Sequence, residues 1–149
     1  MPLAYGFAHS HGSPYMHSFE DLRAQLGNHP GIVNSEPYLI GIDIPLEGGR
    51  SQGVFLADLE HEDGSRLLRI SSPVAPLDAL DALRCLRFNW AQRVGFLAAG
   101  ELDGRDYLHV CENRRYRALQ AEDVDGLLVE IADLADRLES LLNEGRDHA

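Results

Sequence analysis

The fold is decided by residues 38–71, YLIGIDIPLEGGRSQGVFLADLEHEDGSRLLRIS. Apolar side chains alternate with other residues along 38–45, so one face of a strand there is apolar. Apolar runs return at 54–59 and at 67–71. The turn sequence at 62–65 contains Asp-Gly, which tolerates the positive φ of a type I′ hairpin turn. We therefore predict three strands in an antiparallel meander.

A short helix is predicted just before this meander. Ser18 is a favourable N-cap, and Asp21 lies in the first turn, where the helix dipole stabilises a negative charge. Gly27 ends the helix. Residues 1–17 show no periodicity, and we expect a flexible N-terminal tail. Met16 offers an alternative translation start within it.

A second helix and a second hairpin are predicted after the meander. Residues 72–76 contain two prolines and end the third strand. An apolar stripe then predicts a helix over 77–89. Strands at 96–101 and 107–111 flank a turn at 102–105, which again contains Asp-Gly.

The last element is the most regular in the sequence. Apolar residues recur at spacings of three and four along 124–142, which predicts an amphipathic helix that ends at Gly145. The predicted order is therefore α-β-β-β-α-β-β-α, an α+β fold with an antiparallel sheet packed against helices. We expect a single domain over residues 18–143 and a short C-terminal tail over 144–149.

The composition excludes several classes of function. The chain has 149 residues, and 24 acidic residues outweigh 13 basic ones, all of them Arg, to give a net charge of −11. Such a surface repels the phosphates of nucleic acids and of anionic membranes. No apolar run reaches the ~20 residues of a membrane span. Two cysteines are too few for a disulfide framework. We expect a cytoplasmic protein that neither binds nucleic acid nor inserts into a membrane.

No motif predicts catalysis, a metal site or a cofactor. His9 and His11 supply only two metal ligands. His109 and Cys111 share one face of a predicted strand, but no third residue is placed to orient a base for the thiol. Acidic clusters such as residues 58–63 fall mostly at turns, where Asp is favoured for conformational reasons. We therefore expect a non-enzymatic protein.

Two surfaces could contact a partner. The only basic cluster is Arg114-Arg115-Tyr116-Arg117, which in so acidic a chain is expected to pair with carboxylates or to anchor an acidic partner. The helix at 77–89 has large apolar residues on more than one side, so core packing and a homodimer contact are equal alternatives. The candidate dimer residues are Leu80, Leu83, Leu86, Phe88 and Trp90.

At these residues the sequence resembles the type III secretion chaperone family, which has the CesT/YbjN-like fold. The similar segments are Leu83–Trp90, Gly95–Ala99, Gly104, Leu108–Val110, Leu119 and the long acidic helix. Leu86 and Asn89 match an LxxN-like segment. The net acidity of the chain and its use of Arg without any Lys are similar to those of HpaB-type general effector chaperones. The resemblance covers residues 17–143 and rests on hydrophobic pattern and topology rather than on a catalytic signature.

The resemblance implies a homodimer without catalysis that binds the N-terminal segment of secreted effector proteins and keeps it competent for export. Binding would use apolar patches and strand addition at a sheet edge. The expected effector-binding residues are Phe19, Leu22, Leu26, Ile40, Ile42, Val54 and Leu56. A YbjN-like protein that binds a regulator or sensor is the alternative reading, and a small enzyme is a weaker one. Docking to the secretion ATPase is left open.

Overall fold

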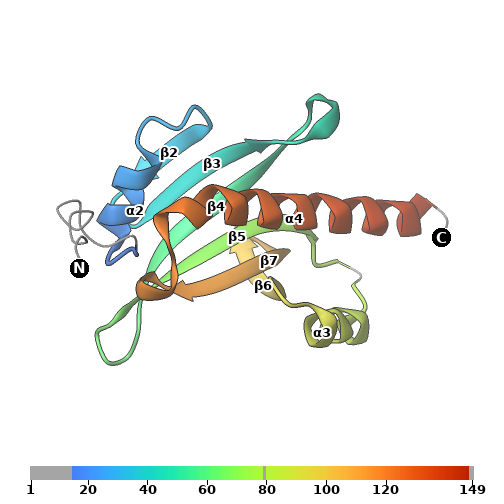
Figure 1. The fold of residues 1–149 in the computed structure, drawn as a ribbon. Helices are drawn as coiled ribbons and strands as arrows, with labels where there is room; N and C mark the ends of the chain where they lie inside the picture. Colours follow the sequence, from blue (N-terminus) through green and yellow to red (C-terminus); the bar gives the residue numbers. More distant parts are fainter. Residues whose placement is uncertain (1–14, 79, 148–149) are drawn as a thin grey trace, which may run out of the picture.

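The alternating pattern of residues 38–71 forms the centre of a six-stranded antiparallel sheet with the order β2-β3-β4-β5-β7-β6 (Figure 1). The computed structural model describes residues 15–78 and 80–147. The strands are β2 (Ile32–Glu36), β3 (Leu39–Pro45), β4 (Ser51–Glu60), β5 (Arg66–Pro76), β6 (Phe96–Leu102) and β7 (Arg105–Arg115). The α+β class and the antiparallel sheet are as predicted.

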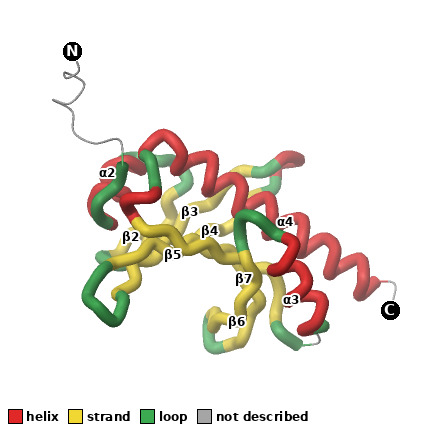
Figure 2. The backbone as a smooth tube through the Cα atoms, turned by 60° about the horizontal axis from the view of Figure 1, so that its bottom comes forward, coloured by secondary structure: helices red, strands yellow, loops and turns green. Residues whose placement is uncertain are grey.

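Within the described residues, three α-helices accompany the sheet: α2 (Phe19–Leu26), α3 (Ala82–Ala91) and α4 (Val124–Asp147). Helices α2 and α4 lie on the same side of the sheet, whereas α3 lies beside β6 (Figure 2). We call the side under α4 the helix-covered face; its cross-strand row includes Ile40, Leu56 and Ile70. We call the other side the open face; its neighbouring row includes Phe55 and Ser71.

The core lies between the helix-covered face and the amphipathic α4. Leu128 and Ile131 of α4 are fully buried, as are Ile40, Leu56 and Leu68 on the strands. Burying one such side chain contributes about 1.5–3 kcal/mol, so this contact dominates the stability of the domain.

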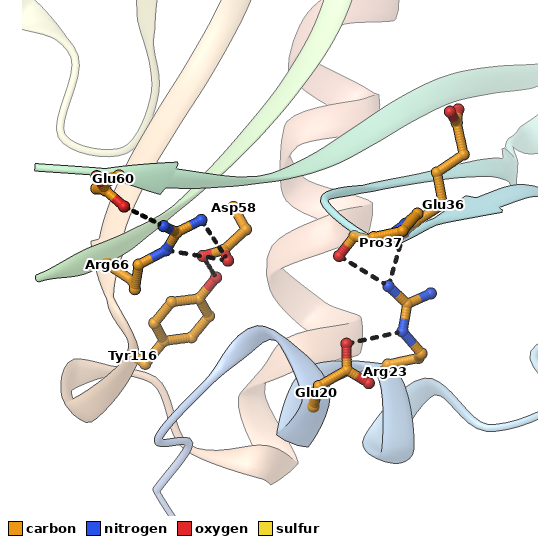
Figure 3. Close-up of polar contacts among 8 residues, drawn as sticks. All are labelled: Glu20, Arg23, Glu36, Pro37, Asp58, Glu60, Arg66 and Tyr116. Carbon is orange, nitrogen blue, oxygen red and sulfur yellow. Dashed lines mark hydrogen bonds and ion pairs between the residues drawn. The ribbon is translucent and has the colours of Figure 1, made fainter. Parts of the chain in front are cut away.

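Strand β2 was not predicted, and the observed order is α-β-β-β-β-α-β-β-α. The strand has exposed polar residues at Asn34, Ser35 and Glu36, so its sequence lacks an apolar alternation. Strand β2 is held in place instead by its pairing with β3 and by hydrogen bonds from α2. Arg23 of α2 donates to the Glu36 carbonyl at 2.7 Å and to the Ser35 hydroxyl (Figure 3 shows the Glu36 contact).

Strand β5 continues past Ser71, although residues 72–76 were predicted to end it. Pro73 has no N–H to donate, and pairing between β4 and β5 stops at Phe55 and Ser71. Two side chains supply the missing bonds: Gln52 Nε2 donates to the Pro73 carbonyl at 2.9 Å, and Ser72 Oγ donates to the Gly53 carbonyl at 2.6 Å. On its other side, β5 remains paired with β7 along this segment.

The two Asp-Gly hairpins differ in turn geometry. Asp103 and Gly104 both have positive φ, 52° and 79°, as a type I′ turn requires. In the first hairpin only Gly64 has a positive φ, so the predicted type I′ turn is wrong there. Asp63 accepts the Ser65 N–H at 2.9 Å instead and stabilises a longer loop.

The helix boundaries follow their caps. Ser18 accepts the Asp21 N–H at 3.1 Å, as predicted. Helix α3 begins at Ala82 rather than at Leu77, because the Asp81 carboxylate caps it by accepting the Leu83 N–H at 3.0 Å. The backbone of α4 stays helical to Asp147, so the prediction that Gly145 ends the helix is wrong, and the predicted C-terminal tail from residue 144 begins inside this helix.

The predicted N-terminal tail extends too far. Met16 is buried in the core, and its N–H donates to the Leu119 carbonyl at 2.9 Å. Tyr15 pairs with Gln120 in an isolated bridge. Residues 15–17 therefore belong to the folded domain, and the rest of the predicted tail, with His9 and His11, lies outside the described residues.

Candidate interaction surfaces

Helix α3 presents an apolar face that nothing in the described chain covers. Leu83, Leu86 and Trp90 are 54%, 66% and 90% exposed. Their spacing of three and four residues places them on one side of the helix. Cys85 and Phe88 face the other way and pack against the core. The helix is thus apolar on both sides, and only one side is buried.

The five candidate dimer residues therefore fall into two groups. Leu83, Leu86 and Trp90 form the exposed face, which we call the α3 face. Leu80 and Phe88 are partly buried against the domain's own core. Contact with a second chain stays a prediction for the first group, whereas the second group already has an intramolecular role.

Asn89 attaches α3 to the sheet at the edge strand β6. Its Oδ1 accepts the Leu97 N–H at 2.6 Å, and its Nδ2 donates to the Leu97 carbonyl at 3.2 Å. Both backbone groups of Leu97 point away from β7, so they would otherwise be free at the sheet edge. This pairing fixes α3 with Leu83, Leu86 and Trp90 turned away from the core.

The seven expected effector-binding residues are all in the core. They lie on α2 and on the helix-covered face of β3 and β4, because that face packs against α4. None is presented on the surface of the folded chain, so binding at these positions stays a prediction that requires the core to open. The residues are Phe19, Leu22, Leu26, Ile40, Ile42, Val54 and Leu56.

His109 and Cys111 lie together on β7 but are not joined by a carboxylate. The His109 Nε2 is 3.2 Å from the Gly100 carbonyl oxygen, and its Nδ1 has no partner among the described residues. Burial raises the pKa of the Cys111 thiol, and the charge of Arg69 opposes this effect only in part. A thiol with a raised pKa carries little thiolate at neutral pH and is a poor nucleophile.

The acidic residues near the β4–β5 hairpin form a structural network (Figure 3). Arg66 donates to Asp58 at 3.0 Å and to Glu60 at 2.8 Å, and the Tyr116 hydroxyl donates to Asp58 at 2.7 Å. Burial and the adjacent Asp58 carboxylate raise the pKa of the Tyr116 hydroxyl, which therefore stays protonated. The network ties the segment after β7 to the end of the sheet.

The structure separates the arginines of the basic cluster. Arg114 projects from the helix-covered face and donates to Glu112 at 2.6 Å, as the prediction of pairing with a carboxylate required. Arg115 is exposed on the open face. The sequence showed four adjacent residues, but strand alternation turns neighbours to opposite sides of the sheet.

Neither His109 nor Cys111 lines either of two open grooves on the described part of the chain. The larger, of about 520 Å³, lies between the loop after α2, the end of β3 and the start of α4, and its lining includes Ile44, Leu128 and Val129. The other, of about 410 Å³, lies beside the segment between β7 and α4. Within residues 15–78 and 80–147, no three His, Cys, Asp or Glu side chains are grouped to hold a metal ion.

The sequence alone did not reveal that the Asn89 side chain pairs with the Leu97 backbone, or which residues share the open face of the sheet. Asn89 carried a signal, since it was part of the LxxN-like segment, but its partner lies on another element.

None of the helices in the described part of the chain combines the length and apolar character needed to cross a membrane.

The fold and these surfaces define an α+β protein with a twisted antiparallel sheet (Figure 1), covered by helices on one face, and with a helix beside the edge strand β6 whose outer face is apolar and exposed. No protein-family profile and no curated protein matches the chain.

Proposed function

We propose that this chain is a non-enzymatic chaperone of bacterial type III secretion, which acts as a homodimer in the cytoplasm and holds the N-terminal segment of secreted effector proteins ready for export. The observation that carries the proposal is the α3 face. An exposed tryptophan beside two exposed leucines is typical of a protein interface, in which Trp often contributes most of the binding energy.

A second copy of the chain is the partner that best fits the α3 face. Two chains with a net charge of −11 each repel one another over most of their surface. Helix α3 carries no carboxylate within Ala82–Ala91, and it includes Arg84 and Arg87. Repulsion between two copies is therefore weakest at this helix. A two-fold axis there would bury the same apolar residues from both chains.

Partner capture tests the chaperone function. Tagged protein is purified from its native bacterium at moderate salt, and the retained proteins are identified by mass spectrometry. We expect secreted proteins, and we expect deletion of their N-terminal segments to abolish retention. Recovery of a transcription factor or a sensor in place of secreted proteins would contradict the proposal and favour the regulatory alternative. A preparation with no specific partner would also contradict it.

A further inference from the structure

The open face of the sheet carries two arginines side by side. Arg69 on β5 is in register with Asn113 on β7, and Arg115 is two residues further along β7 on the same face. The two arginines are therefore diagonal neighbours, about 7–8 Å apart at their backbones. Both side chains are exposed. Arg69 Nε donates to Asn113 Oδ1 at 3.0 Å, a neutral partner that leaves its charge uncompensated.

No carboxylate of the described residues pairs with either of these arginines. The carboxylates at this end of β4 and β7, Asp58, Glu60 and Glu112, lie in register with Leu68, Arg66 and Ile70 on the helix-covered face.

On the open face, the cross-strand row that contains Arg69 has its carboxylate on β2. Glu36 shares a cross-strand row with Arg69, but three strand spacings, about 14 Å, separate them. Salt screens charges at that distance. In a chain of net charge −11, the register of β5 and β7 therefore places two arginines without an ion pair together on the open face.

Apolar side chains surround the two arginines. Leu67 is in register with Arg115, and Leu59 is in register with Leu67 on the next strand. Ala57 is in register with Arg69, and Phe55 lies two residues further along β4. These side chains are only partly buried, since no helix covers this face of β4 and β5 (Figure 2). The surface thus combines half-exposed apolar groups with two cations.

We propose that the open face around Arg69 and Arg115 binds an apolar segment of a partner protein that carries carboxylates. This proposal deepens the proposed function and rests on it, because it states the chemistry of the bound segment. Carboxylates two residues apart on an extended chain are about 7 Å apart, which matches the spacing of the two arginines. Arginine forms bidentate contacts with carboxylates. Leu59 and Leu67 would contact apolar residues that flank the two carboxylates on the same face of the segment.

A peptide titration tests this chemistry. The probes are three fluorescent peptides in which Ser occupies every second position and the positions between follow the order Leu, Glu, Glu, Leu (the Leu-Glu peptide), or carry Gln or Lys in place of Glu. The readout is fluorescence anisotropy with the full-length protein. We expect the Leu-Glu peptide to bind most tightly and more weakly at high salt. The variant Arg69→Glu with Arg115→Glu should bind it about tenfold or more weakly. Arg137→Glu, at an exposed position of α4 away from both the open face and the α3 face, is the control for charge and should bind like the wild type.

The outcomes separate this proposal from the proposed function. Equal affinity for the three peptides, or unchanged binding of the Leu-Glu peptide by the double variant, would overturn the acidic-segment proposal. If captured secreted proteins are retained equally by the wild type and the double variant, the acidic-segment proposal again fails while the chaperone function stands. If the wild type captures no secreted protein, the chaperone function itself fails.

Discussion

The side chain of Asn89 replaces a neighbouring strand at the backbone of Leu97. It accepts the Leu97 N–H at 2.6 Å and donates to the Leu97 carbonyl at 3.2 Å. A single amide thus blocks one pairing position on the edge of β6 and holds α3 against the sheet. The same contact turns the α3 face away from the core, so the position of Asn89 determines which side of α3 is available to another chain.

Removing this amide should loosen α3 without unfolding the sheet. Asn89→Ala loses two hydrogen bonds in a partly buried place, which we expect to lower the free energy of unfolding by about 1–3 kcal/mol. Hydrogen exchange at the Leu97 amide should become faster. Asn113→Ala, which loses one exposed bond to Arg69, is the control and should leave Leu97 exchange unchanged. Protection of Leu97 in Asn89→Ala equal to that in the wild type would refute the role assigned to Asn89.

A charge in the α3 face should break the predicted homodimer. Leu86→Asp places a carboxylate in an apolar contact, which is costly to bury, so we expect light scattering to show a monomer. Leu141→Asp is a matched control, because Leu141 on α4 is 61% exposed and Leu86 is 66% exposed. The control should remain a dimer. A folded Leu86→Asp protein that is still dimeric would show that the interface lies elsewhere.

The Tyr116 hydroxyl should make stability fall in alkaline solution. Its pKa is raised above the ordinary value of 10.0, so above that pH the folded chain keeps a proton that the unfolded chain loses. The unfolded state then binds fewer protons, and the free energy of unfolding decreases as the pH rises. Urea unfolding at neutral pH and above pH 10 measures this decrease.

Tyr116→Phe provides the comparison for this effect. At neutral pH it should be less stable than the wild type by about 1–3 kcal/mol, because the Asp58 carboxylate loses its bond to the hydroxyl. Above pH 10 the difference between the two proteins should shrink. A difference that stays constant with pH would contradict the raised pKa.

Cys111 should be unreactive in the folded protein. Burial raises its pKa and limits access, so in a Cys85→Ser background we expect a thiol reagent to label Cys111 slowly at neutral pH and rapidly in urea. The companion variant Cys111→Ser reports on Cys85, which is partly buried on α3 and should react faster. Equal rates for Cys111 in the folded and unfolded protein would contradict the structure.

Local patterns were enough to predict most of the elements. Ser18 caps α2 and Asp103-Gly104 forms a type I′ turn, because these features depend on residues within one turn of one another. The regular apolar spacing along α4 predicted a long amphipathic helix for the same reason. The polar strand β2 and the continuation of β5 through Pro73 could not be predicted locally, since both depend on partners distant in the sequence.

Alternation along β3 and β4 identified which residues share a face, but not which face is covered. Ile40 and Leu56 became core residues because α4, from the far end of the chain, packs on their side of the sheet. The opposite face was left open, and strand register alone brings Arg69 and Arg115 together there. Periodicity is a local property of the chain, whereas exposure depends on what the rest of the chain covers, and this is why the candidate surfaces emerge only from the folded structure.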